Sequence, residues 1–280
     1  MAKEIAKKFF LDYFPQYRSQ IRAFKKILVG FSNQIFKATL LDGRSYKVRV
    51  AENNNLISRE GEIEVLKWVE DPNLIYYEES TGNAIYNWIE GDQLSVRFIN
   101  EEMLQKIIEL AEKYHKVPVD QLQNVPTHDH FDAASKVDKD RIEYRHYFPI
   151  YRELVEKYRD LPLVLTHNDI SLKNLIYDPD SGSDELILID YEWARLNTIY
   201  WEYGNFIRES LLSKEKIVLL SKLLKLEENI LIDFAFISTY YSWQLSFNWD
   251  RSERLEKYRC KLIAQLEKYE GWRHKTSLME

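Results

Sequence analysis

The chain has 280 residues, enough for two lobes with separate cores, and its content of 45% hydrophobic and 30% charged residues is ordinary for a globular protein. A formal net charge of −6 excludes the broad basic surface of nucleic-acid-binding proteins, so no nucleic-acid partner is expected. The single cysteine excludes an intrachain disulfide, the first residues lack an apolar signal core, and no apolar run reaches the roughly 18 residues of a membrane span. These features predict a cytoplasmic protein without membrane insertion.

The first 90 residues predict an antiparallel sheet with one main helix. Residues 1–20 carry apolar side chains at helical spacing and are expected to form a helix that caps this domain. An amphipathic run at 58–69 predicts the main helix. Short apolar segments bounded by turn residues predict five strands, at 24–29, 34–40, 45–50, 74–78 and 83–89.

The turn between the first two strands is a candidate phosphate-binding loop. Gly30 would give the backbone access to nucleotide phosphates, and Ser32 and Asn33 would supply hydrogen-bond donors. A single glycine in a hairpin is more often an ordinary turn residue. The assignment therefore depends on motifs elsewhere in the chain.

The third strand offers two cations for a nucleotide. Lys47 and Arg49 share one face by the two-residue period of a strand. Either could hold phosphates, as the third-strand lysine of protein kinases does, and Glu60 or Glu62 in the following helix could pair with it. A solvated strand face is the alternative.

A short connection after the fifth strand is typical of a hinge between two lobes. The strand breaks at Glu-Gly-Asp (90–92), and the backbone around Asn87 and Ile89 would be placed to hydrogen-bond an adenine edge. We therefore expect a nucleotide-binding lobe over residues 1–90 and a catalytic, substrate-binding lobe over residues 91–280.

The second lobe is predicted to be mainly helical. Residues 101–116 and 141–159 have helical periodicity, and the segment between them, 117–138, is predicted to be a loop. The triplet His-Asp-His at 128–130 lies on this loop without a cysteine or a third partner nearby, so no metal site is assigned to it.

The stretch 167–174 has the form H-x-D-x-x-x-x-N, the spacing of a kinase catalytic loop. Asp169 is expected to accept the proton of the attacking hydroxyl. Asn174 and Asp190, which ends an apolar strand, are expected to hold Mg²⁺, with Glu192 as a further carboxylate. A predicted strand hairpin between them brings Asn174 and Asp190 to the same end.

These motifs together predict an α+β, two-lobed, protein-kinase-like fold that transfers a phosphoryl group from ATP with Mg²⁺. The N-terminal lobe would hold the five-stranded antiparallel sheet with one main helix, and the C-terminal lobe would be mainly helical. A fold that kept this scaffold and lost its activity is the alternative.

A second motif carries a family resemblance. The sequence Ile-Asp-Tyr-Glu-Trp at 189–193, with Gly204, Asn205 and Glu209 after it, resembles the signature of the choline/ethanolamine kinase family, within the larger group that includes aminoglycoside phosphotransferases. Bacterial choline kinases are the most similar in pattern, and the resemblance covers nearly the whole chain. Glu202 stands where that family usually has an aspartate.

The resemblance implies roles for individual residues. It makes Asp169 the base, Asn174 and Asp190 the magnesium ligands, and Glu192 an additional carboxylate on the metal side. It favours Arg49 over Lys47 as the strand cation. It further matches Glu62 to the cation's partner, and Ser32 and Asn33 to the loop over the phosphates.

The acceptor pocket is predicted from the chemistry of an organic cation. A trimethylammonium group donates no N–H hydrogen bond, so aromatic faces and a nearby anion must hold it. Glu209 is the candidate anion. The resemblance matches Tyr240 and Trp243 to an aromatic pair on a C-terminal helix, and core packing is the alternative for each aromatic residue. The candidate aromatic residues are Trp193, Tyr240, Trp243 and Trp249.

The sequence thus predicts a kinase that phosphorylates the hydroxyl of a small amino alcohol, choline before ethanolamine. An aminoglycoside phosphotransferase is the first rival, but a polycationic sugar needs several clustered carboxylates, whereas the C-terminal part of this chain is aromatic with few clustered acids. A nucleotide- or choline-binding module without activity is the second rival. The sequence leaves the oligomeric state open.

Overall fold

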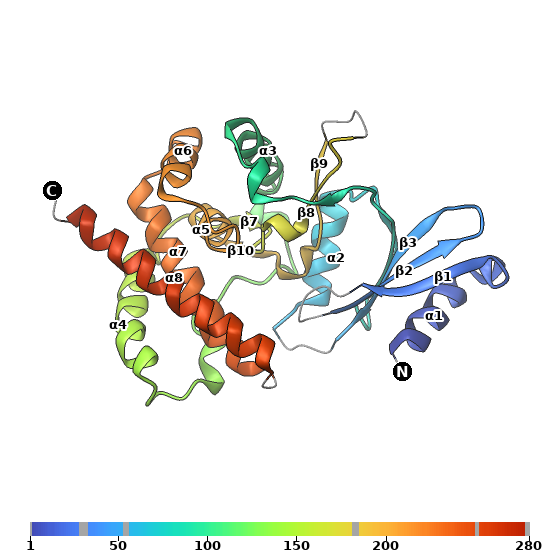
Figure 1. Ribbon diagram of the computed structural model, residues 1–280, viewed down its shortest axis with the longest axis horizontal. Helices are drawn as coiled ribbons and strands as arrows, with labels where there is room; N and C mark the ends of the chain where they lie inside the picture. Colours follow the sequence, from blue (N-terminus) through green and yellow to red (C-terminus); the bar gives the residue numbers. More distant parts are fainter. Residues whose placement is uncertain (1, 28–32, 53–55, 181–184, 250–251, 278–280) are drawn as a thin grey trace.

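Two lobes lie side by side along the long axis of the molecule (Figure 1). The structure is a computed structural model that describes residues 2–27, 33–52, 56–180, 185–249 and 252–277. The sheet with its N-terminal helix forms one end, and the helices of the second lobe form the other (Figure 1). This arrangement confirms the predicted two-lobed α+β fold.

The first lobe is built on a five-stranded antiparallel sheet with the order β1-β2-β3-β5-β4. One main helix, α2 (Arg59–Trp68), connects β3 to β4. The prediction of five strands and one helix is confirmed, although the fifth strand ends at Asn87 rather than at Ile89. The strands are β1 (Ile21–Ile27), β2 (Asn33–Leu40), β3 (Ser45–Ala51), β4 (Leu74–Glu78) and β5 (Asn83–Asn87).

The N-terminal helix α1 (Ala2–Tyr13) covers one face of this sheet. Ala6 and Phe10, four residues apart on one side of the helix, are fully buried against Phe24 and Tyr46. Their cluster is separate from the main core, so the first lobe has apolar packing of its own. The predicted capping helix is therefore present.

Helix α2 lies between the sheet and the second lobe (Figure 1). Ser58 caps its first turn by accepting a hydrogen bond from the Gly61 amide. A Cβ at Gly61 would lie 2.9 Å from the backbone oxygen of Asn124, so only glycine allows this approach to the second lobe. Val65 and Leu66 on α2 belong to the main core. This helix is consequently attached to both lobes.

Short strands organise the part of the second lobe that faces the first. The strands β6 (Asp92–Gln93), β8 (Leu175–Tyr177) and β9 (Leu186–Leu188) form one antiparallel sheet. The strands β7 (Val164–Thr166) and β10 (Arg195–Asn197) form another. β6 follows directly after the hinge, so the connection between the lobes is short. The predicted hairpin before Asp190 is confirmed as the pair β8–β9.

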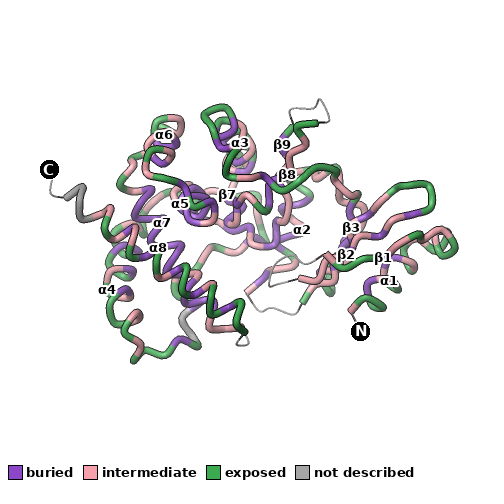
Figure 2. Tube along the Cα trace, viewed as in Figure 1, coloured by how far each residue is buried: buried purple, intermediate pink, exposed green. Residues whose placement is uncertain are grey.

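Helices make up most of the second lobe. Helix α7 runs through its interior, with 14 of its residues buried, and packs against α4, α5 and α8. Figure 2 shows the same concentration of buried positions along α5 and α7. In the described part of the chain, no helix combines the length and the apolar character that crossing a membrane requires. The helices are α3 (Glu101–His115), α4 (Ile142–Lys157), α5 (Ile199–Glu209), α6 (Lys214–Leu224), α7 (Glu228–Leu245) and α8 (Glu253–Ser277). Short 3₁₀-helical segments are η1 (Pro15–Tyr17), η2 (Val96–Phe98), η3 (Val119–Gln121), η4 (Asp132–Lys136), η5 (Leu172–Asn174), η6 (Tyr191–Trp193) and η7 (Ser246–Asn248).

The close contact of α5 with α7 depends on a glycine. A Cβ added to Gly204 would lie 2.6 Å from the backbone carbon of Phe234 on α7. Any larger side chain would therefore push the two helices apart. The glycine of the Gly-Asn motif has a packing role in this structure.

Candidate active site

The loop between β7 and β8 and the residue after β9 meet at one place. The backbone amide of Ile189 donates to the carbonyl oxygen of Asn174 at 2.9 Å, which extends the β8–β9 pairing to the last residue before Asp190. Asp190 itself has φ = 77°, a left-handed conformation that aspartate tolerates better than most residues. The hairpin therefore holds Asn174 and Asp190 at the same end, as the sequence predicts.

Asp169 lies beside Asn174 in this loop. The amide nitrogen of Asn174 donates to the Asp169 carboxylate at 3.0 Å and to the Asp169 carbonyl oxygen at 2.9 Å. Burial, followed by the negative charge of Glu209, raises the pKa of Asp169 to about 8. Without a bound cation this carboxyl group therefore favours its protonated form near neutral pH. Because an opposite charge nearby lowers the pKa of a carboxyl group, a cation held at Asp190 would favour the ionised, proton-accepting form.

Buried polar groups hold the backbone of this loop. The Glu202 side chain, which is fully buried on α5, accepts the amide hydrogen of Asn168 at 3.1 Å. Asn168 has φ = 67°, and its side-chain oxygen accepts a hydrogen bond from Asn197 at 3.0 Å. His167 contacts the carbonyl oxygen of Ile189 through Nε2 at 3.1 Å. The loop is therefore fixed to α5, β10 and the strand before Asp190.

Two cavities meet at these residues. One has a volume of about 190 Å³ and contains Asp169, while the other has about 340 Å³ and lies between the sheet and the second lobe. Both are lined by Lys173, Asn174 and Asp190. The predicted metal ligands thus lie where the two cavities adjoin.

The larger cavity has apolar walls from both lobes. Ile27 and Ile35 line it from β1 and β2, and Ile176 and Ile189 line it from the second lobe. Such a slot suits a flat aromatic base between two apolar surfaces. The hinge contributes Asn87 and Ile89, the two positions predicted to recognise adenine, together with Tyr86 and Trp88.

Arg49 and Glu62 pair with each other, as the family resemblance implies, but away from the larger cavity. Two guanidinium nitrogens of Arg49 lie 2.5 and 3.0 Å from the two carboxylate oxygens of Glu62, and Arg49 also donates to the Gly82 carbonyl oxygen. Both side chains are 1% exposed. Lys47, not Arg49, lines the cavity. Ser32 lies outside the described residues.

Glu192 is engaged by other protein groups. Its Oε2 accepts from the Asn33 amide at 2.5 Å and lies 3.4 Å from Nη1 of Arg59, which also contacts Glu62 at 3.1 Å. The structure therefore uses Glu192 and Asn33 to join the sheet, α2 and the segment after β9. The expected metal-side carboxylate is already bound by a cation that the sequence analysis did not single out.

The smaller cavity contains Trp193, Trp249 and Glu209, three of the predicted substrate-binding residues. Tyr240 and Trp243 are not among its lining residues, because both are 0% exposed in the packing between α7 and its neighbours. The side of α7 that reaches the cavity carries other residues instead. Aromatic and polar lining residues that sequence reasoning missed are Trp201, Arg208, Tyr241, Ser242 and Tyr258.

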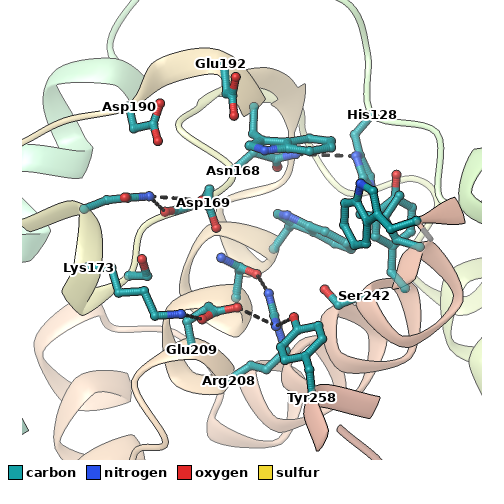
Figure 3. A pocket seen from close by; sticks show the side chains of 18 residues that line it. His128, Asn168, Asp169, Lys173, Asp190, Glu192, Arg208, Glu209, Ser242 and Tyr258 are labelled. Atoms are coloured by element: carbon teal, nitrogen blue, oxygen red, sulfur yellow. Dashed lines mark hydrogen bonds and ion pairs between the residues drawn. The ribbon is translucent and has the colours of Figure 1, made fainter. Parts of the chain in front are cut away.

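Glu209 lies between two cations at the edge of this cavity (Figure 3). Nη1 of Arg208 lies 2.7 Å from Oε1, and Nζ of Lys173 lies 3.5 Å from Oε2. Burial opposes ionisation of Glu209, but Arg208 and then Lys173 outweigh it and lower the pKa below its usual range. Glu209 is consequently a stable anion.

The donor set at the junction fits Mg²⁺ held together with a nucleotide. Within the described ranges, no group of three His, Cys, Asp or Glu side chains is arranged to hold a metal ion. Mg²⁺ commonly takes one or two protein oxygens and completes its shell with phosphates and water. Asn174 turns its nitrogen toward Asp169, so its amide oxygen would be the atom available to a cation, and Asp190 would supply a carboxylate.

Sequence comparison places the chain among known proteins. An uncharacterized protein from Mycoplasma pneumoniae is 31% identical over 191 residues, which is 67% of this chain and 64% of that protein. Ethanolamine kinase 2 from Mus musculus is 27% identical over 137 residues, or 44% of this chain and 35% of that enzyme. The chain therefore spans less than two thirds of the length of either relative.

Comparison with solved structures shows that the chain shares its fold with a known kinase. The crystal structure of choline kinase LicA from Streptococcus pneumoniae superimposes with a TM-score of 0.74, covering 94% of this chain and 99% of LicA at 14% identity. Identity at this level establishes the shared fold only.

The sequence profile described as choline/ethanolamine kinase matches residues 24–274. Because that match spans nearly the whole sequence, the chain belongs to the choline/ethanolamine kinase family.

Proposed function

We propose that this protein transfers the terminal phosphoryl group of ATP to the hydroxyl of a small cationic amino alcohol, choline in the first instance. The observation that carries the proposal is the junction of the two cavities. Asn174 and Asp190 line both, and Asp169 lies in the smaller one beside them. A nucleotide in one cavity and an alcohol in the other would face each other across the metal ligands.

Asp169 is the proposed base. It would accept a hydrogen bond from the alcohol, orient the oxygen toward the phosphorus and take up the proton as the new bond forms. The Asn174 amide holds the Asp169 carboxylate in place. Asn174 and Asp190 would bind Mg²⁺, which neutralises the charge of the phosphates.

The proposed division of labour follows the two lobes. Residues 1–90 would bind the nucleotide, with the backbone at Asn87 and Ile89 reading the adenine edge. Residues 91–280 would carry the catalytic and acceptor sites. Lys47 lines the larger cavity and is the strand cation that we place near the nucleotide, whereas the Arg49–Glu62 pair would position α2.

Aromatic faces and one carboxylate support a cationic acceptor. Trp193, Trp249 and Tyr258 line the smaller cavity together with Glu209. Such surfaces attract an ammonium group that has lost its hydration shell. The volume of about 190 Å³ is below the roughly 300–1,000 Å³ of sites for drug-sized ligands, which favours an amino alcohol over an aminoglycoside.

Choline is preferred to ethanolamine on chemical grounds. A trimethylammonium group needs apolar and aromatic contacts on all sides, and the cavity supplies indole and phenol rings from several elements. Relatives of both kinds are similar to this chain, since LicA is described as a choline kinase and the mouse relative as an ethanolamine kinase. Ethanolamine is therefore the alternative acceptor.

ATP consumption measured in parallel with choline, ethanolamine and kanamycin tests the proposal. We expect turnover with choline and a fall of at least about 100-fold in kcat for Asp169→Asn, because the variant loses the proton acceptor. The matched control is Asp160→Asn, the same change at an exposed position outside both cavities.

Two outcomes would contradict the proposal. Turnover with kanamycin alone would favour an aminoglycoside phosphotransferase. ATP binding without turnover of any alcohol would favour a binding module that kept the scaffold and lost its activity.

A further inference from the structure

The two cations beside Glu209 are held very differently. Arg208 is 5% exposed, and its guanidinium also contacts Asn205 at 2.5 Å and Tyr258 at 3.3 Å. Lys173 reaches Glu209 at 3.5 Å with a side chain that is 69% exposed. Arg208 is thus a fixed part of the wall, whereas Lys173 is a solvent-facing side chain that can change its position.

This arrangement poses a problem for a cationic acceptor. The two oxygens of Glu209 each face a protein cation, so the carboxylate is already compensated before any ligand enters. With both cations in place the three side chains carry one net positive charge, which repels an ammonium group. Displacement of Lys173 removes this excess charge and exposes one oxygen of Glu209 to the ligand.

The larger cavity offers the Lys173 side chain a second position. It is one of the three residues that line both cavities, and it directly precedes the proposed metal ligand Asn174. Figure 3 shows its side chain extending toward Glu209 from the loop that carries Asp169. On the other side of this loop the larger cavity would hold the phosphates, the strongest negative charge available to a displaced lysine.

We propose that Lys173 is a counter-ion that the cationic acceptor displaces from Glu209 toward the phosphates of the nucleotide. This inference rests on the proposed function, since it needs a cationic alcohol and a nucleotide bound together. Lys173 would then be a positioning residue for both ligands rather than part of the acceptor pocket alone.

Coupling between the two ligands follows. The acceptor and the nucleotide both favour the Lys173 position that faces the phosphates, so each raises the affinity of the other by the same factor. Without an acceptor, Lys173 stays on Glu209 and the phosphates lack one cation. The Lys173–Glu209 pair would therefore restrain ATP hydrolysis by water until an alcohol is bound.

The test compares choline with its neutral carbon isostere, in which a tert-butyl group replaces the trimethylammonium group. Affinities are measured by calorimetry with and without Mg²⁺ and a non-hydrolysable ATP analogue. For the native protein we expect the analogue to tighten choline binding at least about fivefold and to leave the isostere unchanged. Lys173→Met should bind choline more tightly than the native protein when no nucleotide is present, and it should lose the coupling.

Lys113→Met, at an exposed lysine of α3 outside both cavities, is the matched control and should behave as the native protein. The inference is overturned if Lys173→Met keeps the native coupling, or if it binds choline no better than the native protein without nucleotide. It is also overturned if the neutral isostere shows the same coupling as choline. Failure of the native protein to bind or phosphorylate any amino alcohol would instead contradict the proposed function, so the two failures are distinguishable.

Discussion

At the scale of single residues, the site contains carboxyl groups whose pKa values are shifted in opposite directions by their surroundings. Glu209 is kept ionised by two cations, whereas burial raises the pKa of Asp169 to about 8. Glu202 is fully buried behind the loop that carries Asp169, and burial raises its pKa to about 8 as well. Glu209 is therefore an anion, whereas Asp169, without a bound cation, and Glu202 favour the protonated form near neutral pH.

The pKa of Glu202 predicts a pH dependence of stability. The folded state binds the Glu202 proton more strongly than the unfolded chain, where the ordinary pKa is 4.5. This contribution is fully present below about pH 4.5 and is lost as the pH rises to about 8, with a slope of up to about 1.4 kcal/mol per pH unit. Glu202→Gln removes the titration while keeping an acceptor for the Asn168 amide.

Urea unfolding of the native protein and Glu202→Gln at several values between about pH 5 and pH 8 measures this difference. The native protein should lose free energy of unfolding relative to the variant as the pH rises. Parallel curves over this window would show that Glu202 has an ordinary pKa in the folded state.

A second residue-scale prediction concerns the aromatic wall. Trp249→Leu keeps an apolar side chain and removes an aromatic face, so KM for choline should rise about threefold to thirtyfold, equivalent to roughly 0.5–2 kcal/mol. Trp88→Leu is the matched change in the larger cavity and should alter KM for ATP instead. Steady-state kinetics that show the opposite pattern would exchange the roles of the two cavities.

Local patterns predicted which residues meet around Asp169 better than which residues line the rest of the smaller cavity. Asp169, Asn174 and Asp190 belong to one loop and one hairpin, so their spacing along the chain determines their spacing in space. Tyr240 and Tyr241 lie on α7, which is buried nearly all round. A helix that is apolar on every side gives no periodic signal of which residue faces a cavity.

At the scale of elements, the periodicity of α5 does indicate which of its residues line the smaller cavity. Trp201, Asn205, Arg208 and Glu209 follow the helical spacing i, i+4, i+7 and i+8, and all four line the smaller cavity. Starting from Glu209, the spacings i−4 and i−8 predict Asn205 and Trp201, and Arg208 lies three residues after Asn205. For Lys47 and Arg49, the strand period placed both on one face and did not distinguish them. The fold does, because Glu62 of the next helix covers Arg49 while Lys47 lines the larger cavity.

The close packing of α5 on α7 makes a prediction for Gly204. In Gly204→Ala the new Cβ would meet the backbone of Phe234, so the helices must separate at a cost of about 1–3 kcal/mol or more. Trp201 and Glu209 would move with α5, and choline affinity should fall as well. Chemical denaturation and calorimetry measure the two effects.

Gly271→Ala is the matched control for this change. Nothing lies within 4 Å of a Cβ at Gly271, which is exposed on α8. The substitution should leave choline affinity unchanged and stabilise the helix by about 0.5–1 kcal/mol. Equal losses of stability and choline affinity for both variants would show that the close contact of α5 with α7 is not required for either property.

At the scale of the whole molecule, a chain of charged groups connects the lobes. Arg49 pairs with Glu62, and Arg59 lies between Glu62 and Glu192. These residues come from β3, α2 and the segment after β9, and all but Arg59 are nearly inaccessible to solvent. The network therefore connects the sheet through α2 to the segment that carries Asp190 and Glu192.

This network predicts a large loss of stability for Arg59→Met. The variant removes the cation that two buried carboxylates share, so we expect a loss of about 1–3 kcal/mol in the free energy of unfolding. Lys67→Met on the same helix removes an exposed pair with Glu79 and should change stability by less than about 0.5 kcal/mol. Urea titration of both variants checks the contrast, and similar losses would contradict it.

The double attachment of α2 limits how nucleotide can enter and leave. On one side of the larger cavity the lobes are continuous through the hinge, and on another α2 is joined to β3 by the Arg49–Glu62 pair and to the second lobe by Glu64, which accepts the amides of Gln123 and Asn124. A wide clamshell opening would break these bonds. A nucleotide in the larger cavity, as we propose, should therefore leave by local displacement of β1 and β2, whose Ile27 and Ile35 line this cavity.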